Sequence, residues 1–160
     1  MLEIIQAQTN QDIELIRNLL EEYGKWGVNV GLAYPEEYQA FLEQLANLPG
    51  VFAPPDGCLL LAKYKSHPAG CVALRKLSDD TCEMKRLYVA QEFRGLGIGR
   101  FLAIDVIERA RKIGYTRMRL DTVASMKAAR ALYKSLGFKE IEAYRYNPLE
   151  GATFMELELT

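Results

Sequence analysis

The sequence predicts a single mixed α/β domain over residues 1–160, with a sheet that is mostly antiparallel but holds one parallel pair of strands. Three strand-like segments follow one another at 58–64, 70–77 and 82–89 with only short turns between them, which is typical of an antiparallel meander. A glycine loop and a long amphipathic segment then lead from 82–89 to a further alternating segment, 116–121. Because a strand–helix–strand crossover in one sheet brings its two strands parallel, we expect 82–89 and 116–121 to be neighbours.

The N-terminal part predicts one strand and two helices. Residues 2–7 form a short β-like run, and Thr9 with Asp12 gives a capping-box-like start to the first helix. The stretch 23–34 is aromatic and interrupted by glycines, so we expect a shaped loop there. Pro35 opens the second helix, because proline fits the first helical turn.

Glycines also mark the ends of the two later helices. Apolar residues recur at helical spacing over 98–113, and Gly114 follows where a C-terminal glycine belongs. We expect Ser125 to cap a last helix, which Gly137 closes. Two short strands complete the sheet, near 139–141 and 154–159. The expected architecture is therefore a mixed sheet flanked by four helices.

Composition and charge exclude several classes of partner. The net charge is −1 with both signs interspersed, so nucleic acid is not an expected partner. No apolar run reaches membrane-spanning length and the N-terminus lacks a signal-peptide pattern, so we expect no membrane partner and a cytoplasmic location. Cys58, Cys71 and Cys82 are odd in number and form no CxxC pair, which favours reduced core thiols and no metal site. Lys85 and Arg86, with Arg94 and Arg100, form a small basic run that suits one small anionic ligand, and the alternative is that Lys85 and Arg86 are exposed strand residues.

The most informative stretch leads from the strand 82–89 into the next helix through three glycines. Gly95, Gly97 and Gly99 let backbone amides and the positive end of the helix dipole converge on one phosphate. A dinucleotide-binding loop is the obvious rival, since Asp121 lies near the expected place of a ribose-binding acid. However, the spacing is GxGxG rather than GxGxxG, and a five-residue turn separates strand from loop, which disfavours that alternative.

Two ordered motifs point to a family. The stretch from Arg94 to Gly99, RGLGIG, matches the pattern [Q/R]xxGx[G/A], and Ala129 to Phe138, ARALYKSLGF, matches A-x-x-L-Y-x-x-x-G-F. On these motifs the chain resembles the GNAT superfamily of acyl-CoA-dependent N-acetyltransferases, over about a third of its length. The family often has an asparagine where this chain has Met126, and the neighbouring Ser125 is the expected substitute for its hydrogen bond to the cofactor.

The resemblance implies acetyl-CoA as the acetyl donor. It also implies a GNAT-like fold in which the parallel pair of strands splays apart, so that the pantetheine arm bonds to the exposed backbone of one strand. The pyrophosphate is expected over the glycine loop and the helix N-terminus. The cofactor-binding residues implied by the resemblance are Leu87, Tyr88, Val89, Arg94, Gly95, Leu96, Gly97, Ile98, Gly99, Arg100, Ser125 and Tyr133.

The same resemblance suggests catalytic roles. Tyr133 occupies the family's tyrosine position and is expected to protonate the leaving thiolate. Glu83 begins the central strand, where some members carry a glutamate base, and is the first candidate for taking the proton of the amine. Asp121 and Tyr144 are weaker alternatives for that role. His67, the only histidine, falls in a predicted turn and is expected to have a surface role.

The acceptor cleft of this architecture lies between the first two helices and the C-terminal hairpin, which map to 23–38 and 144–148. The candidate substrate-binding residues there are Trp26, Tyr34, Asp121, Tyr144 and Asn147. An aromatic surface with hydrogen-bonding tips fits a small amine or amino-acid-like molecule better than a basic protein tail, although these aromatics equally fit a purely structural role. A non-catalytic acyl-CoA sensor or partner-binding module, a protein N-terminal or lysine acetyltransferase, and a homodimeric assembly stay open.

Overall fold

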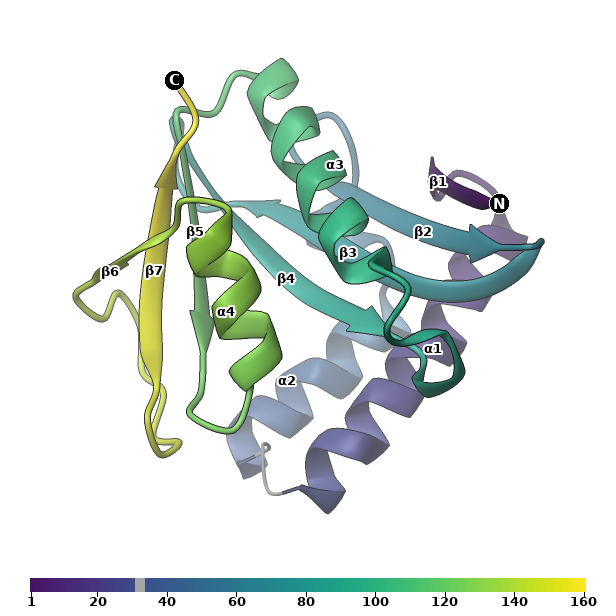
Figure 1. Ribbon diagram of the computed structural model, residues 1–160, viewed down its shortest axis with the longest axis horizontal. Coiled ribbons are helices and arrows are strands. Elements are labelled where there is room, and N and C mark those ends of the chain that lie inside the picture. The colour runs from purple at the N-terminus through teal and green to yellow at the C-terminus, as the bar shows by residue number, and fades with distance from the viewer. Residues whose placement is uncertain (31–33) are drawn as a thin grey trace.

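The computed structural model describes residues 1–30 and 34–160, which form a seven-stranded mixed sheet with two helices on each face (Figure 1). The strands in chain order are β1 (Leu2–Gln6), β2 (Cys58–Tyr64), β3 (His67–Lys76), β4 (Thr81–Val89), β5 (Arg117–Thr122), β6 (Lys139–Ile141) and β7 (Thr153–Glu158). The helices are α1 (Asn10–Asn29), α2 (Pro35–Ala46), α3 (Ile98–Ile113) and α4 (Lys127–Ser135), with short 3-10 turns at Gly50–Phe52 and Gln91–Phe93. The expected mixed α/β architecture with four helices is confirmed.

The sheet separates two apolar layers, because alternate residues of each strand point to opposite faces. Leu60 and Ala62 of β2 pack in the layer under α3 and α4, whereas Leu59 and Leu61 pack in the layer under α1 and α2. All four side chains are fully buried. The central strands are therefore apolar on both faces, which is why β2 and β3 show no polar alternation.

The strand order is β1-β2-β3-β4-β5-β7-β6, and β4 with β5 is its parallel pair. The meander β2-β3-β4 and the parallel crossover through α3 are both as predicted. Pairing of β4 with β5 ends after Glu83 and Arg119, so the rest of β4 has no partner on that side. The expected splayed pair is present, and α3 and α4 lie on one face of it (Figure 1).

The prediction of a loop over 23–34 is wrong at its start, because α1 continues to Asn29. A Cβ atom on Gly24 would lie 2.7 Å from Cε2 of Phe41 on α2. This glycine therefore permits close packing of two helices rather than ending one. Residues 31–33 of that stretch lie outside the described residues.

Two smaller expectations also fail. Ser125 does not cap α4, since Met126 holds the N-cap position and no side chain there bonds the helix amides. His67 is not in a turn but begins β3, because the hairpin turn is only two residues long. Those residues, Lys65 and Ser66, have φ of 50° and 68°, as a tight turn matched to the strand twist requires. By contrast, the Thr9 cap is confirmed by a 3.1 Å hydrogen bond from the amide of the third residue beyond it.

Candidate active site

The gap between β4 and β5 leaves backbone groups of β4 facing outward. The two strands diverge after their short paired segment (Figure 1). On the opposite side of β4, the amide of Ala90 donates to the carbonyl of Ala69 at 2.8 Å. Since backbone groups alternate in direction along a strand, Leu87 and Val89 direct their amide and carbonyl groups into the gap. A ligand that contains amides can bond there as an additional strand.

The glycine loop presents amides at the N-terminus of α3. Gly95 and Gly97 have φ of +83° and +80°, the left-handed region that favours glycine. Within the described part of the chain, no amide from Gly95 to Arg100 donates a hydrogen bond. These donors and the dipole of a 16-residue helix form an anion site. The residues present therefore fit a pyrophosphate.

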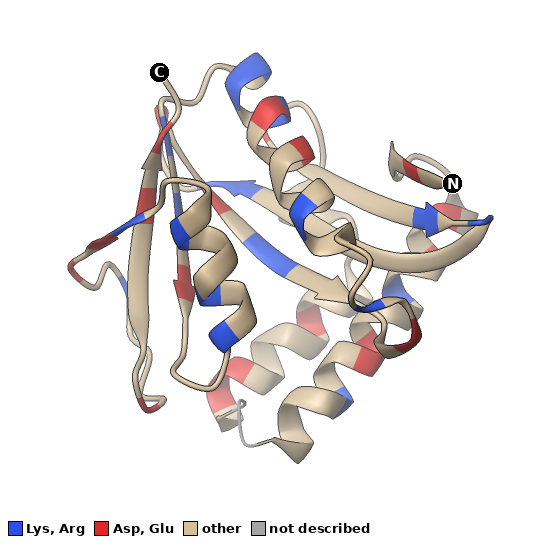
Figure 2. Cartoon of the chain, in the orientation of Figure 1, with Lys and Arg blue, Asp and Glu red and all other residues tan. Residues whose placement is uncertain are grey.

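Basic side chains surround this N-terminus. The helix α4 carries Lys127, Arg130 and Lys134 but no acidic residue, and Figure 2 shows it with blue segments and no red one. Arg100 Nη1 donates to Ser135 Oγ at 3.0 Å and so links α3 to α4. This edge of the molecule is suited to an anionic ligand.

The side chain of Arg94 packs against the end of β4 and against α1, at the start of the glycine loop. Its Nε donates to the carbonyl of Val89 at 3.0 Å, and its guanidinium lies 5.8 Å from the ring centres of both Trp26 and Tyr88. Trp26 lines a hollow between α1 and α2, beside Phe41, which adjoins the main pocket because both are lined by Tyr23, Glu37 and Arg86. Trp26 itself does not line the main pocket.

A pocket opens beside the gap, with walls from α1, α2, β4, β5, α4 and the β6–β7 loop. It is lined by five of the predicted site residues, namely Tyr34, Leu87, Asp121, Tyr133 and Asn147. Met126, which stands at the asparagine position of the family motif, lines it too, whereas Ser125 next to it is exposed. The pocket thus joins the exposed backbone of β4 to the predicted acceptor side.

Tyr133 is a buried residue whose side chain reaches the pocket. It is 7% exposed and packs its ring 5.7 Å from that of Phe138. Its hydroxyl donates no hydrogen bond within the described residues. Burial raises the pKa of the Tyr133 phenol well above its usual range, so this hydroxyl keeps its proton at physiological pH.

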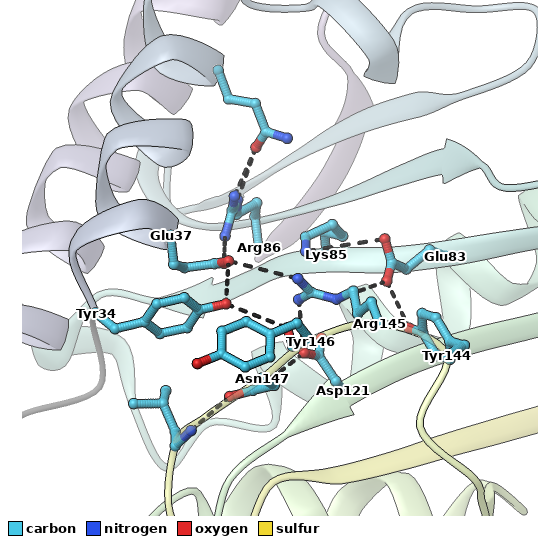
Figure 3. A network of polar contacts seen from close by, with 12 residues as sticks. Tyr34, Glu37, Glu83, Lys85, Arg86, Asp121, Tyr144, Arg145, Tyr146 and Asn147 are labelled. Atoms are coloured by element: carbon cyan, nitrogen blue, oxygen red, sulfur yellow. Dashed lines mark hydrogen bonds and ion pairs between the residues drawn. The ribbon is translucent and has the colours of Figure 1, made fainter.

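Glu83 is fully buried and does not line the pocket, although the next two residues of β4 do. Its Oε1 accepts from Arg75 Nε at 2.8 Å. Its Oε2 accepts from the Tyr144 hydroxyl at 2.6 Å (Figure 3). Two further cations are near, with Lys85 Nζ at 4.0 Å and Arg145 Nε at 3.8 Å. Glu83 is thus an anion surrounded by three cations, and Tyr144 is a fourth neighbour that donates a hydrogen bond to it.

Arg145, on the β6–β7 loop, ties three elements together. Its Nη2 donates to Asp121 Oδ2 at 2.7 Å, and its Nη1 lies 3.6 Å from Glu37 on α2 (Figure 3). Asn147 donates to the same Asp121 oxygen at 3.0 Å. Burial by itself raises the pKa of Asp121, but the bonds from Arg145 and Asn147 and the charge of Lys85 outweigh it, so the pKa is lowered.

Sequence reasoning missed several charged residues of this pocket, among them Lys85, Arg86, Glu37 and Arg145. Lys85 and Arg86 were expected on the surface, but their side chains are only 9% and 10% exposed. The available signal was a pair of basic residues inside a strand otherwise predicted to be buried, since lysine and arginine are rarely buried without partners. Arg86 has φ of 60°, an irregularity that no residue pattern announces.

The remaining expectations concern metals, membranes and thiols. Among the described residues there is no cluster of three potential metal ligands. None of the described helices is long and apolar enough to cross a membrane. The three cysteines are buried and not bonded to one another, as expected of core thiols, and burial raises the pKa of each to about 12.

Comparisons with known proteins agree with this geometry. Residues 14–138 match the model of the Acetyltransferase (GNAT) family. An uncharacterized N-acetyltransferase of Schizosaccharomyces pombe is 36% identical over 162 residues, which cover 99% of this chain and 96% of that protein. N-acetylaspartate synthetase of Danio rerio is 35% identical over 116 residues, which cover 71% of this chain and 41% of that protein.

Solved structures share the fold. PaiA N-acetyltransferase from Thermoplasma acidophilum, in complex with coenzyme A, matches with a TM-score of 0.77 at 21% identity over 99% of both chains. A GNAT-family acetyltransferase from Staphylococcus aureus matches with a TM-score of 0.80 at 20% identity over the whole of both chains. The chain therefore belongs to the GNAT family of acetyltransferases, enzymes that use acetyl-CoA as the acetyl donor.

Proposed function

We propose that this enzyme transfers the acetyl group of acetyl-CoA to the primary amine of a small, amino-acid-like molecule, by direct attack in a ternary complex. The observation that carries the proposal is that Leu87, Tyr133 and Asp121 line one pocket. They contribute, in that order, exposed strand backbone, a protonated phenol and a carboxylate. The similarity to N-acetylaspartate synthetases supports an amino acid as the acceptor.

The strand and the glycine loop bind the donor in this proposal. The amides from Gly95 to Arg100 hold its pyrophosphate, and the backbone groups of Leu87 hold its pantetheine arm. Acetyl-CoA supplies an activated thioester. The amide of Val89 points into the gap and stabilises the negative charge that develops on the acetyl oxygen during attack.

Tyr133 supplies the proton for the leaving sulfur. Its hydroxyl has no other partner among the described residues, and its raised pKa keeps it protonated. A phenol in a desolvated site is a suitable acid for a thiolate that forms beside it. Its position on the pocket wall, together with Met126 at the N-cap of α4, supports this role.

The acceptor amine faces Asp121 rather than Glu83. Glu83 does not take the proton of the amine in this proposal, because both of its oxygens accept hydrogen bonds and none of its surface is exposed. Asp121 has a lowered pKa, so it stays ionised and orients the ammonium group instead of removing its proton. The ammonium group gives that proton to water, and the proton that the nitrogen loses when the amide forms replaces the one that Tyr133 gives to the sulfur. We therefore expect kcat/KM to rise with pH below the pKa of the amine, since only the neutral amine attacks.

The test is a screen of amines that follows release of the free thiol of coenzyme A. Thiol release that requires both acetyl-CoA and an amine supports the transferase. Calorimetric binding of coenzyme A with no turnover across amines, amino acids and short peptides would favour the acyl-CoA sensor. Turnover with peptides alone would favour a protein acetyltransferase and would overturn the small-molecule acceptor.

A further inference from the structure

Lys85 is buried in the pocket without a close partner among the described residues. Its side chain is only 9% exposed, and its nearest carboxylate oxygen, Glu83 Oε1, is 4.0 Å from Nζ (Figure 3). That oxygen already accepts from Arg75, and the other oxygen of Glu83 accepts from Tyr144. The ammonium group of Lys85 therefore lines a pocket and makes no hydrogen bond to the described part of the protein.

The other charges of the pocket do not neutralise it. Asp121 Oδ2 and Glu37 Oε2 are 2.7 Å and 3.6 Å from the guanidinium of Arg145. A second guanidinium, that of Arg86, lies 3.9 Å from Glu37 and donates to a glutamine on α2. Three cations thus face two carboxylates on the pocket wall, and adding Glu83 with its hydrogen-bonded partner Arg75 leaves the same excess of one positive charge. The other titratable groups on this wall are the phenols of Tyr23, Tyr34 and Tyr133.

A buried ammonium without a hydrogen-bonding acceptor is costly, and a ligand anion removes that cost. Burial lowers the pKa of Lys85 to about 8, although Glu83 opposes this effect. We propose that Lys85 binds a carboxylate of the acceptor, which makes the acceptor a carboxylate-bearing amino acid rather than a simple amine. This inference rests on the proposed function and names the substrate class of the same pocket.

Asp121 provides the matching half of a zwitterion site. Its Oδ2 is bonded to Arg145 and Asn147, whereas its Oδ1 makes no hydrogen bond within the described residues. Asp121 and Lys85 lie on β5 and β4, the two strands that diverge around the pocket. An acceptor held at its carboxylate by one strand and at its ammonium by the other keeps its amine beside the gap.

The experiment measures how strongly Lys85 and the acceptor carboxylate depend on each other. kcat/KM is determined for L-aspartate and L-glutamate, their side-chain amides and their α-amides, with wild type, Lys85→Met and Lys85→Arg. A charged hydrogen bond contributes enough to change kcat/KM by about ten- to a hundred-fold. We expect Lys85→Met to lower kcat/KM by that factor for the acids. The loss should be much smaller for whichever amides, side-chain or α, lack the carboxylate that Lys85 binds. The amine pKa cancels, because each acceptor is compared with itself across the enzymes.

The pH profile gives a second readout. With a carboxylate acceptor, kcat/KM of the wild type should stop rising above about pH 8, because free Lys85 loses its charge as fast as the amine becomes neutral. In Lys85→Arg kcat/KM should keep rising toward the pKa of the amine, because arginine stays charged. Lys63→Met, a lysine of β2 away from the pocket, is the matched control.

The outcomes separate the two proposals. Transfer to amino acids with equal loss for acids and both sets of amides in Lys85→Met would overturn the role of Lys85 and leave the transferase intact. A uniform loss of kcat with an altered acidic limb would instead make Lys85 a proton-transfer group. No transfer to any amine would overturn the proposed function, and this inference with it.

Discussion

Replacing Lys85 by methionine should stabilise the fold at neutral pH, because it removes a charge that the protein buries. Burial lowers the pKa of Lys85 from 10.5 in the unfolded chain to about 8 in the folded one. At about 1.4 kcal/mol for each pKa unit, the charged lysine costs the folded state about 3 kcal/mol at pH 7. Methionine has a similar length and no charge, so Lys85→Met should be more stable than wild type by up to that amount.

The sign of the pH dependence follows from proton binding. Between about pH 8 and 10.5 the unfolded chain holds the Lys85 proton and the folded chain does not, so the stability of the wild type gains with rising pH. The advantage of Lys85→Met should therefore shrink over that range. The buried thiols act in the opposite direction, since burial raises the pKa of Cys58, Cys71 and Cys82 from 9 to about 12. That effect is common to both proteins and cancels in their difference.

Urea unfolding, followed by the fluorescence of Trp26, measures the difference at several pH values from 7 to 10. Lys63→Met shows the general effect of the same exchange on a strand. A stability difference between Lys85→Met and wild type that stays constant over this range would refute the reasoning. A destabilised Lys85→Met at pH 7 would also do so, because it would mean that the ammonium is well partnered in the folded protein.

Three further perturbations test other parts of the site. Tyr133→Phe should cut kcat by tens-fold or more and leave acetyl-CoA binding by calorimetry nearly unchanged; full turnover would remove its acid role. Glu83→Gln should lower the free energy of unfolding by about 2 kcal/mol, because it removes the charged acceptor of the bonds from Arg75 and Tyr144, while the shape of the pH–rate profile stays that of the wild type. Activity of this variant that recovers as pH approaches the amine pKa would restore Glu83 as the base. Gly97→Ala should weaken acetyl-CoA binding, since its φ of +80° strains any side chain, whereas unchanged affinity would place the phosphates elsewhere.

Local patterns in the sequence were sufficient for the frame of the molecule. The glycine loop and the strand before it lie within one continuous stretch, so their chemistry is visible in the residues themselves. The meander and the crossover follow from strand spacing and from the handedness of such connections. The core cysteines are also local, because they sit among apolar residues of strands. The role of Gly24 was not visible, since the residue that forbids a side chain there, Phe41, belongs to another helix.

The acceptor side could not be deduced in this way. Its walls come from α2, β4, β5 and the β6–β7 loop, and only the fold brings Glu37, Lys85, Asp121 and Arg145 into one network. Charges interact through space, so the pairing that engages Arg145 and leaves Lys85 without a close partner has no counterpart in sequence spacing. The sequence by itself determined the family and predicted the donor site and the strand that carries it. Which charges face the acceptor was decided by the tertiary structure, because burial and distance exist only once the chain has folded.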